Sequence, residues 1–264
     1  MNRLHNLTIS DKRQKSQMGL DTYALNKDNI LDYPVDKLIL DIKNKIKTEL
    51  EEHERWINLQ DNDPERFKEL EELANLTGDS LYRQMYSYIQ NASSLEDELL
   101  VLFEMKIIYA FKHLEINIKK LLFSAYDDPY INRQFKWDTI IQFLQSKKIN
   151  AKDLNAYEEI NQLRNLNNTL KHSDREIDQF IKNIPEFKDK ELISFIELEL
   201  FYKRIKKAPS VFLDSMVSAI FKDLYTFDHD RIVSMATSLA LRMEKKDADV
   251  FCEELFKLYD QDHH

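Results

Sequence analysis

Cysteine, glycine and proline are scarce in this chain of 264 residues, which contains one, two and five of them. Sheets joined by tight turns usually need more glycine, so this shortage favours long helices joined by short polar turns. The single cysteine, Cys252, excludes an internal disulfide framework and indicates a reducing, cytoplasmic location. No apolar run is long enough to span a bilayer, so we expect no membrane partner. The polar segment Met1–Ser16 lacks the pattern of a secretory signal.

The charge is acidic overall, with a formal net value of −9. Bulk coating of nucleic acid depends on Lys and Arg neutralising phosphates, so this balance argues against it while leaving room for a local basic cleft. The sequence has no Walker-type loop, no HExxH pair and no CxxC pair. We therefore expect no cofactor and no metal site.

Apolar residues recur at helical spacing along most of the chain. The long stripe of Leu100, Phe103, Ile107, Phe111, Leu114, Ile118 and Leu121 predicts a helix that follows Asn91–Ser94 and ends before Asp127. Other helices are expected over Pro34–Gln60 (with Leu38, Ile42, Ile46 and Leu50 inward), Pro64–Leu76, Ser80–Gln90, around Trp137–Leu144, from a cap at Asn150 to His172, around Ile177–Ile181, over Leu192–Ile205, from Pro209, and near Asp230–Met243 and Asp247–Tyr259. Cys252 falls on an apolar stripe with Val250 or Phe251 and Leu255, and is expected in the core.

These patterns suggest three parts: an N-terminal arm and helical appendage over residues 1–92, a helical core over 93–226, and a C-terminal helical pair over 227–264. Met1–Asp32 is weakly patterned and is interpreted as a mobile arm or a loosely docked segment. The boundary is placed at Asn91–Ser94, where serines precede acidic residues in a capping-box pattern.

The stretch Ile160–Ser173, INQLRNLNNTLKHS, is the richest in candidate chemistry. At about 100° per residue, one face carries Leu163, Leu166 and Leu170, and the other carries Asn161, Asn165, Asn168 and His172, with Arg164 at its edge. Metal-free RNA cleavage needs a base for the ribose 2′ proton, an acid for the leaving oxygen and a cation on the phosphate. Histidine suits the proton transfers and arginine suits the phosphate.

We therefore take Arg164, His172 and Asn168 as candidate catalytic residues, and Asn165 and Lys171 as candidate RNA-binding residues. The basic segment YKRIKK adds Lys203, Arg204, Lys206 and Lys207 as further RNA-binding candidates. Two simpler readings stay open. Any solvated helix has a polar stripe opposite an apolar one, and cations favour helix C-termini through the macrodipole.

The segment LRNLNNTLKHS, Leu163–Ser173, resembles the HEPN superfamily. The resemblance is carried above all by Asn168, followed by Lys171 and His172. These are small all-α domains of prokaryotic toxins, antiphage-defence proteins and RNA-processing factors. The preceding segments LLVLFEMKIIYAFKHLEINIKKLLF and WDTIIQFLQSKKI fit the helices that come before this motif, so the resemblance covers roughly residues 95–225. It implies an all-α bundle with a HEPN-like core and extra helices at both ends, and a composite site shared by two chains.

The resemblance implies an RNA-directed protein, a metal-independent ribonuclease or an RNA binder, in a toxin–antitoxin or antiphage system. RNA and a homodimer, or a hetero-oligomer with a protein partner, are then the expected partners. The alternative is a non-catalytic helical adaptor or sensor that acts through protein contacts. It is favoured by the acidic charge and by the seven residues between Arg164 and His172, where the family usually has four to six. That offset turns the two side chains about 80° apart and separates them by about 12 Å along the axis, so we expect a twin helix to complete the site.

Overall fold

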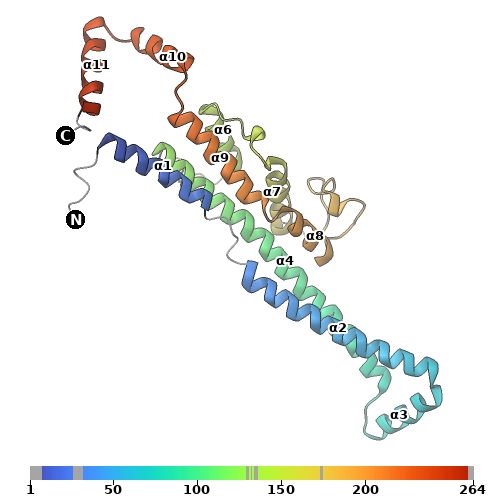
Figure 1. Cartoon of the computed structure of the whole chain (residues 1–264). Helices are drawn as coiled ribbons and strands as arrows, with labels where there is room; N and C mark the ends of the chain where they lie inside the picture. Colours follow the sequence, from blue (N-terminus) through green and yellow to red (C-terminus); the bar gives the residue numbers. More distant parts are fainter. Residues whose placement is uncertain are drawn as a thin grey trace. The chain divides into compact units, whose positions relative to one another are not determined.

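The computed structural model describes residues 8–25, 32–128, 131, 133, 136–172 and 175–260, and the regular structure in these residues is helical (Figure 1). In the same part of the chain, β pairing is limited to one isolated antiparallel bridge between Glu176 and Leu192. The predicted all-α class and helical-bundle architecture are confirmed.

The chain forms ten described α-helices and two short 3₁₀ segments. In order these are α1 (Ile9–Leu25), α2 (Asp32–Asn62), α3 (Pro64–Leu76), α4 (Leu81–Tyr126), α6 (Trp137–Ser146), η1 (Ala151–Asp153), α7 (Tyr157–His172), η2 (Pro185–Phe187), α8 (Phe195–Ile205), α9 (Ala208–Tyr225), α10 (His229–Ala240) and α11 (Lys245–Asp260). Most lie within a few residues of the predicted helices. Gly78, at φ +78°, ends the turn between α3 and α4 as a left-handed residue.

Helix α4 corrects the predicted break at Asn91–Ser94, because it runs without interruption for 46 residues. Ala92 is buried, and the Asn91 side chain donates a 3.1 Å hydrogen bond to Glu49 of α2. Packing against α2 therefore keeps this segment helical, and the serines there sit inside the helix instead of capping one. The predicted domain boundary between residues 92 and 93 falls inside α4.

Four further expectations were wrong. Asn150 caps η1 through Lys152 N–H, and α7 begins only at Tyr157, after Ala156 at φ +62°. Residues 177–181 are not helical, and residues 179–181 form a turn. Cys252 is exposed and is not in the core. On α2 the buried residues are Ile39, Ile42 and Ile46. Leu38 and Leu50, which were predicted to face inward, are 46% and 44% exposed, and Ile39 takes the inward place expected for Leu38.

The N-terminal arm is only partly described, since residues 1–7 and 26–31 of Met1–Asp32 lie outside the described part. Within it, α1 is a regular helix and Leu20 is completely buried. The side chains of Ser16 and Tyr225 share a 2.6 Å hydrogen bond, which links α1 to α9.

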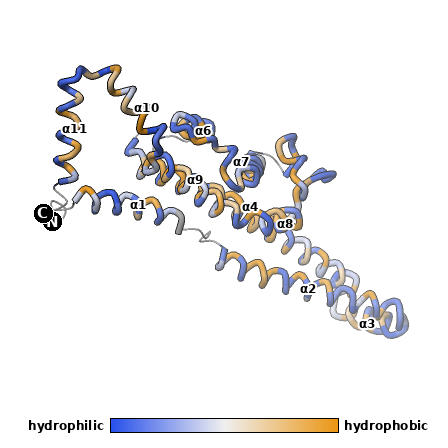
Figure 2. The backbone as a smooth tube through the Cα atoms, turned by 45° about the horizontal axis from the view of Figure 1, so that its top comes forward, coloured by the Kyte–Doolittle hydropathy of each residue, from blue (hydrophilic) through white to orange (hydrophobic). Residues whose placement is uncertain are grey.

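The chain divides into two compact units, each made from segments that are distant in sequence. The α7 unit comprises residues 28–113 and 158–209, and the α9 unit comprises residues 1–27, 114–157 and 210–264. In the α7 unit, α2 runs beside the first part of α4 (Figures 1 and 2). Phe67, Leu81 and Met85 form a small core at the α3 end, packed on Trp56 and Ile57 of α2.

The α9 unit is built around ring contacts between its helices. Trp137 of α6 packs on Phe212 of α9, with centroids 6.3 Å apart, and Tyr126 of α4 meets Phe143 of α6 edge-on at 5.4 Å. The Tyr126 hydroxyl also donates to Asp223 of α9 at 2.9 Å. Burial, together with this acidic partner, raises the Tyr126 pKa well above its usual value.

Candidate functional site

Helix α7 presents one apolar and one polar face, as its spacing predicts. Ile160, Leu163 and Leu166 are completely buried, and Leu170 is half-buried. Two polar residues, Asn167 and Thr169, are also buried, at 1% and 4% exposed. The buried face is therefore wider than the leucine stripe and includes hydrogen-bonding groups.

A cavity of about 320 Å³ lies over the polar face of α7. Its lining residues are Arg164, Asn165, Asn168, Thr169, His172, Asp178 and Phe180. Two of the candidate catalytic residues, Arg164 and His172, thus line the same cavity in one chain, together with the third, Asn168. Both side chains reach this cavity from the same helix, α7.

The far wall of the cavity comes from the segment that follows α7. Residues 173 and 174, including Ser173 of the motif, lie outside the described residues. From Arg175 the chain turns back on itself, with Ile193 N–H donating to Arg175 C=O at 2.9 Å and Ile177 N–H donating to Glu191 C=O at 3.2 Å. Ile181, Ile184 and Phe187 are buried and anchor this excursion to the unit.

Asp178 organises that wall and was not among the predicted site residues. One oxygen, Oδ1, accepts hydrogen bonds from the backbone N–H of Phe180 at 2.7 Å and of Ile181 at 3.1 Å. The other, Oδ2, accepts from the Thr169 hydroxyl of α7 at 2.6 Å. An aspartate that accepts from the amides two and three residues further on caps a turn that starts at its own position. Ile177 therefore lies before this turn, and no regular helix covers Ile177–Ile181.

Phe180 is the other residue that the sequence analysis missed. It lines the cavity while 62% exposed. A large apolar ring left this exposed beside carboxamides and a guanidinium offers a flat surface for another ring. The only signal in the sequence is its place two residues after Asp178 in a turn, and that turn was predicted as helix.

The asparagines are linked to their neighbours along α7. Arg164 Nη2 lies 3.4 Å from Asn165 Oδ1, and Asn167 Nδ2 donates to Asn168 Oδ1 at 3.1 Å. Asn167 Oδ1 is buried without a hydrogen-bond partner among the described residues. The side chains of Asn165 and Asn168 remain at the cavity with amide groups that can meet a ligand.

The remaining predicted RNA-binding residues do not line this cavity. Lys171 is exposed on the last turn of α7. Arg204 forms a bidentate pair with Glu186, at 2.6 and 2.9 Å, and also donates to Gln162 at 2.9 Å. Lys203 pairs with Glu199 at 2.9 Å. The charges of these two cations are thus already balanced within the α7 unit.

The other two cations of the YKRIKK segment are Lys206 and Lys207, and both are exposed. Lys203 and Lys206 line a second cavity of the α7 unit, of about 380 Å³. Its wall also contains Lys106, which is buried between Asp32, Asp36 and Tyr202.

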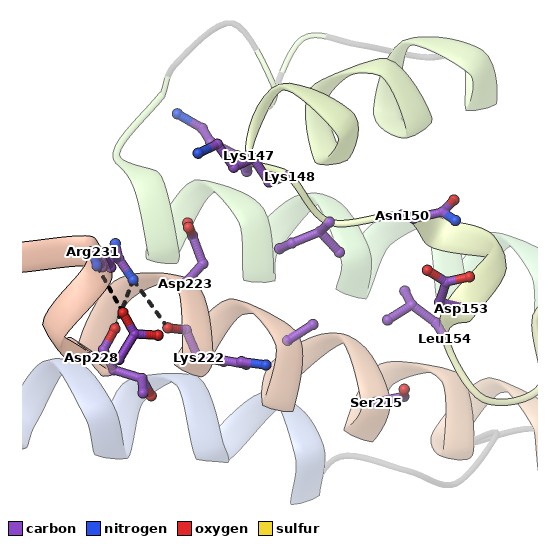
Figure 3. Close-up of a pocket in the computed structure, with 13 residues that line it drawn as sticks. Lys147, Lys148, Asn150, Asp153, Leu154, Ser215, Lys222, Asp223, Asp228 and Arg231 are labelled. Carbon is purple, nitrogen blue, oxygen red and sulfur yellow. Dashed lines mark hydrogen bonds between the residues drawn. The ribbon is translucent and has the colours of Figure 1, made fainter. Parts of the chain in front are cut away.

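A third cavity, of about 430 Å³, lies within the α9 unit (Figure 3). Lys147, Lys148, Lys222 and Arg231 line it, but so do Asp153, Asp223 and Asp228. Its arginine is engaged, because the guanidinium donates to the backbone C=O of Thr226 at 2.9 Å and of Lys222 at 3.3 Å. Lys147 lies 4.8 Å from the Tyr126 ring centre. This cavity therefore combines four cations with three carboxylates, and its arginine is already hydrogen-bonded.

Neither a metal-ligand cluster nor a membrane-spanning helix is present in the described residues. No group of three or more His, Cys, Asp or Glu side chains lies together as a metal site would require. None of the described helices combines the length and apolarity needed to cross a membrane. In comparisons with known proteins, no family model, no curated protein and no solved structure matches this chain.

Proposed function

We propose that the α7 cavity binds single-stranded RNA and that the protein acts as a metal-independent ribonuclease or RNA binder, as the HEPN resemblance implies. The observation that carries this proposal is the gathering of Arg164, Asn168, His172 and Phe180 around one cavity. Sequence-specific recognition of RNA usually takes bases out of the stack, places them on aromatic rings and reads their edges by hydrogen bonds.

Each wall of the cavity has a role in this proposal. The exposed Phe180 ring stacks one unpaired base, and the amides of Asn165 and Asn168 bond its edge. The Arg164 guanidinium holds the adjacent phosphate through its fork of donors. The volume of about 320 Å³ is of the size that holds one small ligand, such as a single nucleotide.

In the cleavage step, the ribose 2′ oxygen attacks the phosphorus and the bond from phosphorus to the 5′ oxygen breaks. His172 takes the 2′ proton, and water protonates the leaving 5′ oxygen. Asp178 is a poor candidate for the base, because three hydrogen bonds already occupy its oxygens. The products are a 2′,3′-cyclic phosphate and a 5′ hydroxyl. A toxin or antiphage component is the biological setting that the resemblance implies.

A second function, that of a non-catalytic adaptor, is supported by different observations. The net charge is −9, and Lys203 and Arg204 are engaged by internal acids. In this alternative the α7 cavity binds a peptide or nothing, and partner proteins bind elsewhere.

Fluorescence anisotropy with a labelled single-stranded RNA and the matched duplex tests the proposal. Base stacking on an aromatic ring contributes about 1–3 kcal/mol, so Phe180→Ala should weaken single-strand binding roughly 5- to 150-fold. Phe227→Ala, at a phenylalanine that is 48% exposed and outside the cavity, is the matched control and should bind normally. Equal affinity for the duplex, or no loss in Phe180→Ala, contradicts the proposal and favours the adaptor.

A further inference from the structure

The C-terminal hairpin of α10 and α11 leaves its apolar side chains uncovered. Neither helix contains a buried residue. Ten large apolar side chains of the hairpin are between 43% and 83% exposed: Ile232, Val233, Met235, Leu241, Val250, Phe251, Leu255, Phe256, Leu258 and Tyr259. Large exposed apolar patches are rare on monomeric proteins and usually mark an interaction site.

Five of these ten residues, together with Leu239, form one apolar stripe on each helix. On α11, Phe251, Leu255 and Leu258 recur at intervals of four and three, which puts them within about 60° of one another around the axis. On α10, Ile232, Met235 and Leu239 do the same. Figure 2 shows the hydrophobic residues recurring along both helices. This is the stripe of a helix that packs on another helix.

We infer that the hairpin is the site at which a second copy of this chain binds, stripe against stripe. Burying an aromatic side chain removes about 150–250 Å² from water, so half-exposed residues offer on the order of 100 Å² each. The stripe and its flanks then offer on the order of 700–800 Å² per chain, which is the area per partner of a stable interface. A twofold dimer needs one self-complementary patch, and each copy carries an equal stripe.

The charge of α11 argues against a lipid membrane as the partner that covers this stripe. Helix α11 carries five acidic residues against three lysines, and Lys257 is paired with Glu254 at 2.7 Å. Helices that lie on membranes are rich in Lys and Arg on their polar face, because the headgroups they meet are anionic. An equally apolar protein helix fits the stripe better, and the inference does not depend on the proposed RNA site.

The test compares two glutamate substitutions in the full chain. Leu255 and Val250 are 43% and 51% exposed on the same helix, but they point about 140° apart. Leu255→Glu puts a carboxylate into the stripe, where burial penalises it, while Val250→Glu adds the same charge outside it. Neither side chain is in the core, so circular dichroism should show unchanged helix content in both.

Sedimentation equilibrium from about 1 to 100 μM should show a dimer for the wild type and Val250→Glu. For Leu255→Glu the dimer dissociation constant should rise at least tenfold, by the same argument on burial. A wild-type monomer at the highest concentration overturns the inference. So does a dimer that both variants weaken equally, or one that neither weakens, because the contact then lies elsewhere.

The only cysteine gives an independent readout. Cys252 is exposed and lies next to Phe251 at the edge of the stripe. Because the chain has no other thiol, a covalent dimer formed with a short bis-maleimide must join two copies at this position. Crosslinking should be efficient in the wild type and in Val250→Glu and be lost in Leu255→Glu. Equal crosslinking in both variants contradicts pairing through this stripe.

Discussion

The hydroxyl of Thr169 donates a 2.6 Å hydrogen bond to Asp178 Oδ2, which joins the last turn of α7 to the segment that forms the far wall of the cavity. The other oxygen of that carboxylate binds the amides of Phe180 and Ile181. One aspartate therefore determines where the Phe180 ring stands relative to the polar face of α7.

Replacing Thr169 by Val keeps the shape and removes the donor, so the wall should loosen. Thr169 is 4% exposed, and a hydrogen bond to a charged acceptor contributes about 1.5–3 kcal/mol. We expect a lower free energy of unfolding and faster amide exchange at Phe180 and Ile181. Thr48→Val, where the exposed hydroxyl donates only to Asn44 C=O in its own helix, is the control. Unchanged exchange at both amides would show that the wall is held by other contacts.

The periodic part of the molecule was predictable and its irregular part was not. The stripe from Leu100 to Leu121 follows from local spacing, and so does the polar face of α7. The Asp178 turn depends on Thr169, which is nine residues away, and this hydrogen bond is visible only in three dimensions. The continuity of α4 through Ala92 likewise depends on α2, whose packing outweighs the local capping signal at the serines.

The sequence alone also did not predict that Arg164 and His172 line one cavity. Helical angles locate the Cα atoms, about 80° apart, but the cavity is shaped by the segment after α7. Cys252 illustrates the converse case. Its nearness to an apolar stripe predicted burial, but Cys252 is exposed, because an amphipathic pattern does not say whether the chain itself covers the apolar face.

Lys106 is the most buried cation of the described residues, with its side chain 3% exposed. Its Nζ lies 2.5 Å from Asp36, 3.3 Å from Asp32 and 4.3 Å from the Tyr202 ring centre, so it ties α2, α4 and α8 together. Lys106→Met keeps the length and leaves both aspartates without their cation. Because those carboxylates reach solvent, we expect a loss of about 2 kcal/mol in chemical unfolding, below the full cost of a buried pair.

Lys47→Met is the control for that measurement. Lys47 and Glu51 are 73% and 63% exposed and pair at 3.6 Å. Exposed pairs contribute about 0–1 kcal/mol, so this variant should unfold close to the wild type. If Lys106→Met is equally stable, the cluster does not hold the α7 unit together.

The protein should become less stable to unfolding as the pH falls, because Glu186 then takes up a proton. Burial favours its neutral form, but the bidentate hydrogen bonds from Arg204 outweigh this and hold its pKa below the usual value. A carboxyl with a lowered pKa in the folded state stabilises above its unfolded pKa, and this contribution is lost as the pH falls through the folded pKa. Glu186→Gln should therefore be less stable than the wild type at pH 7, and the difference should shrink below about pH 4.5.

Glu69→Gln is the matched control for the acid series, because Glu69 pairs with Arg66 at the surface, 64% and 56% exposed. Its difference from the wild type should be small at every pH. Thermal unfolding from pH 7 to 3 makes the comparison. A constant gap between Glu186→Gln and the wild type would show that the carboxylate contributes no pH-dependent stability.

The chemical roles proposed for Arg164 and His172 predict how RNA cleavage responds to their loss. His172→Ala should lower the rate about 10²- to 10⁴-fold, the usual contribution of a general acid or base. Arg164→Lys should also slow cleavage, because an ammonium lacks the bidentate grip on a phosphate. His229→Ala, at an exposed histidine of α10, is the control.

Since both Arg164 and His172 line one cavity of one chain, mixing the two single variants should restore no activity. Recovery on mixing would instead show a site shared between chains, and full activity of His172→Ala would remove the mechanism and leave RNA binding or the adaptor role.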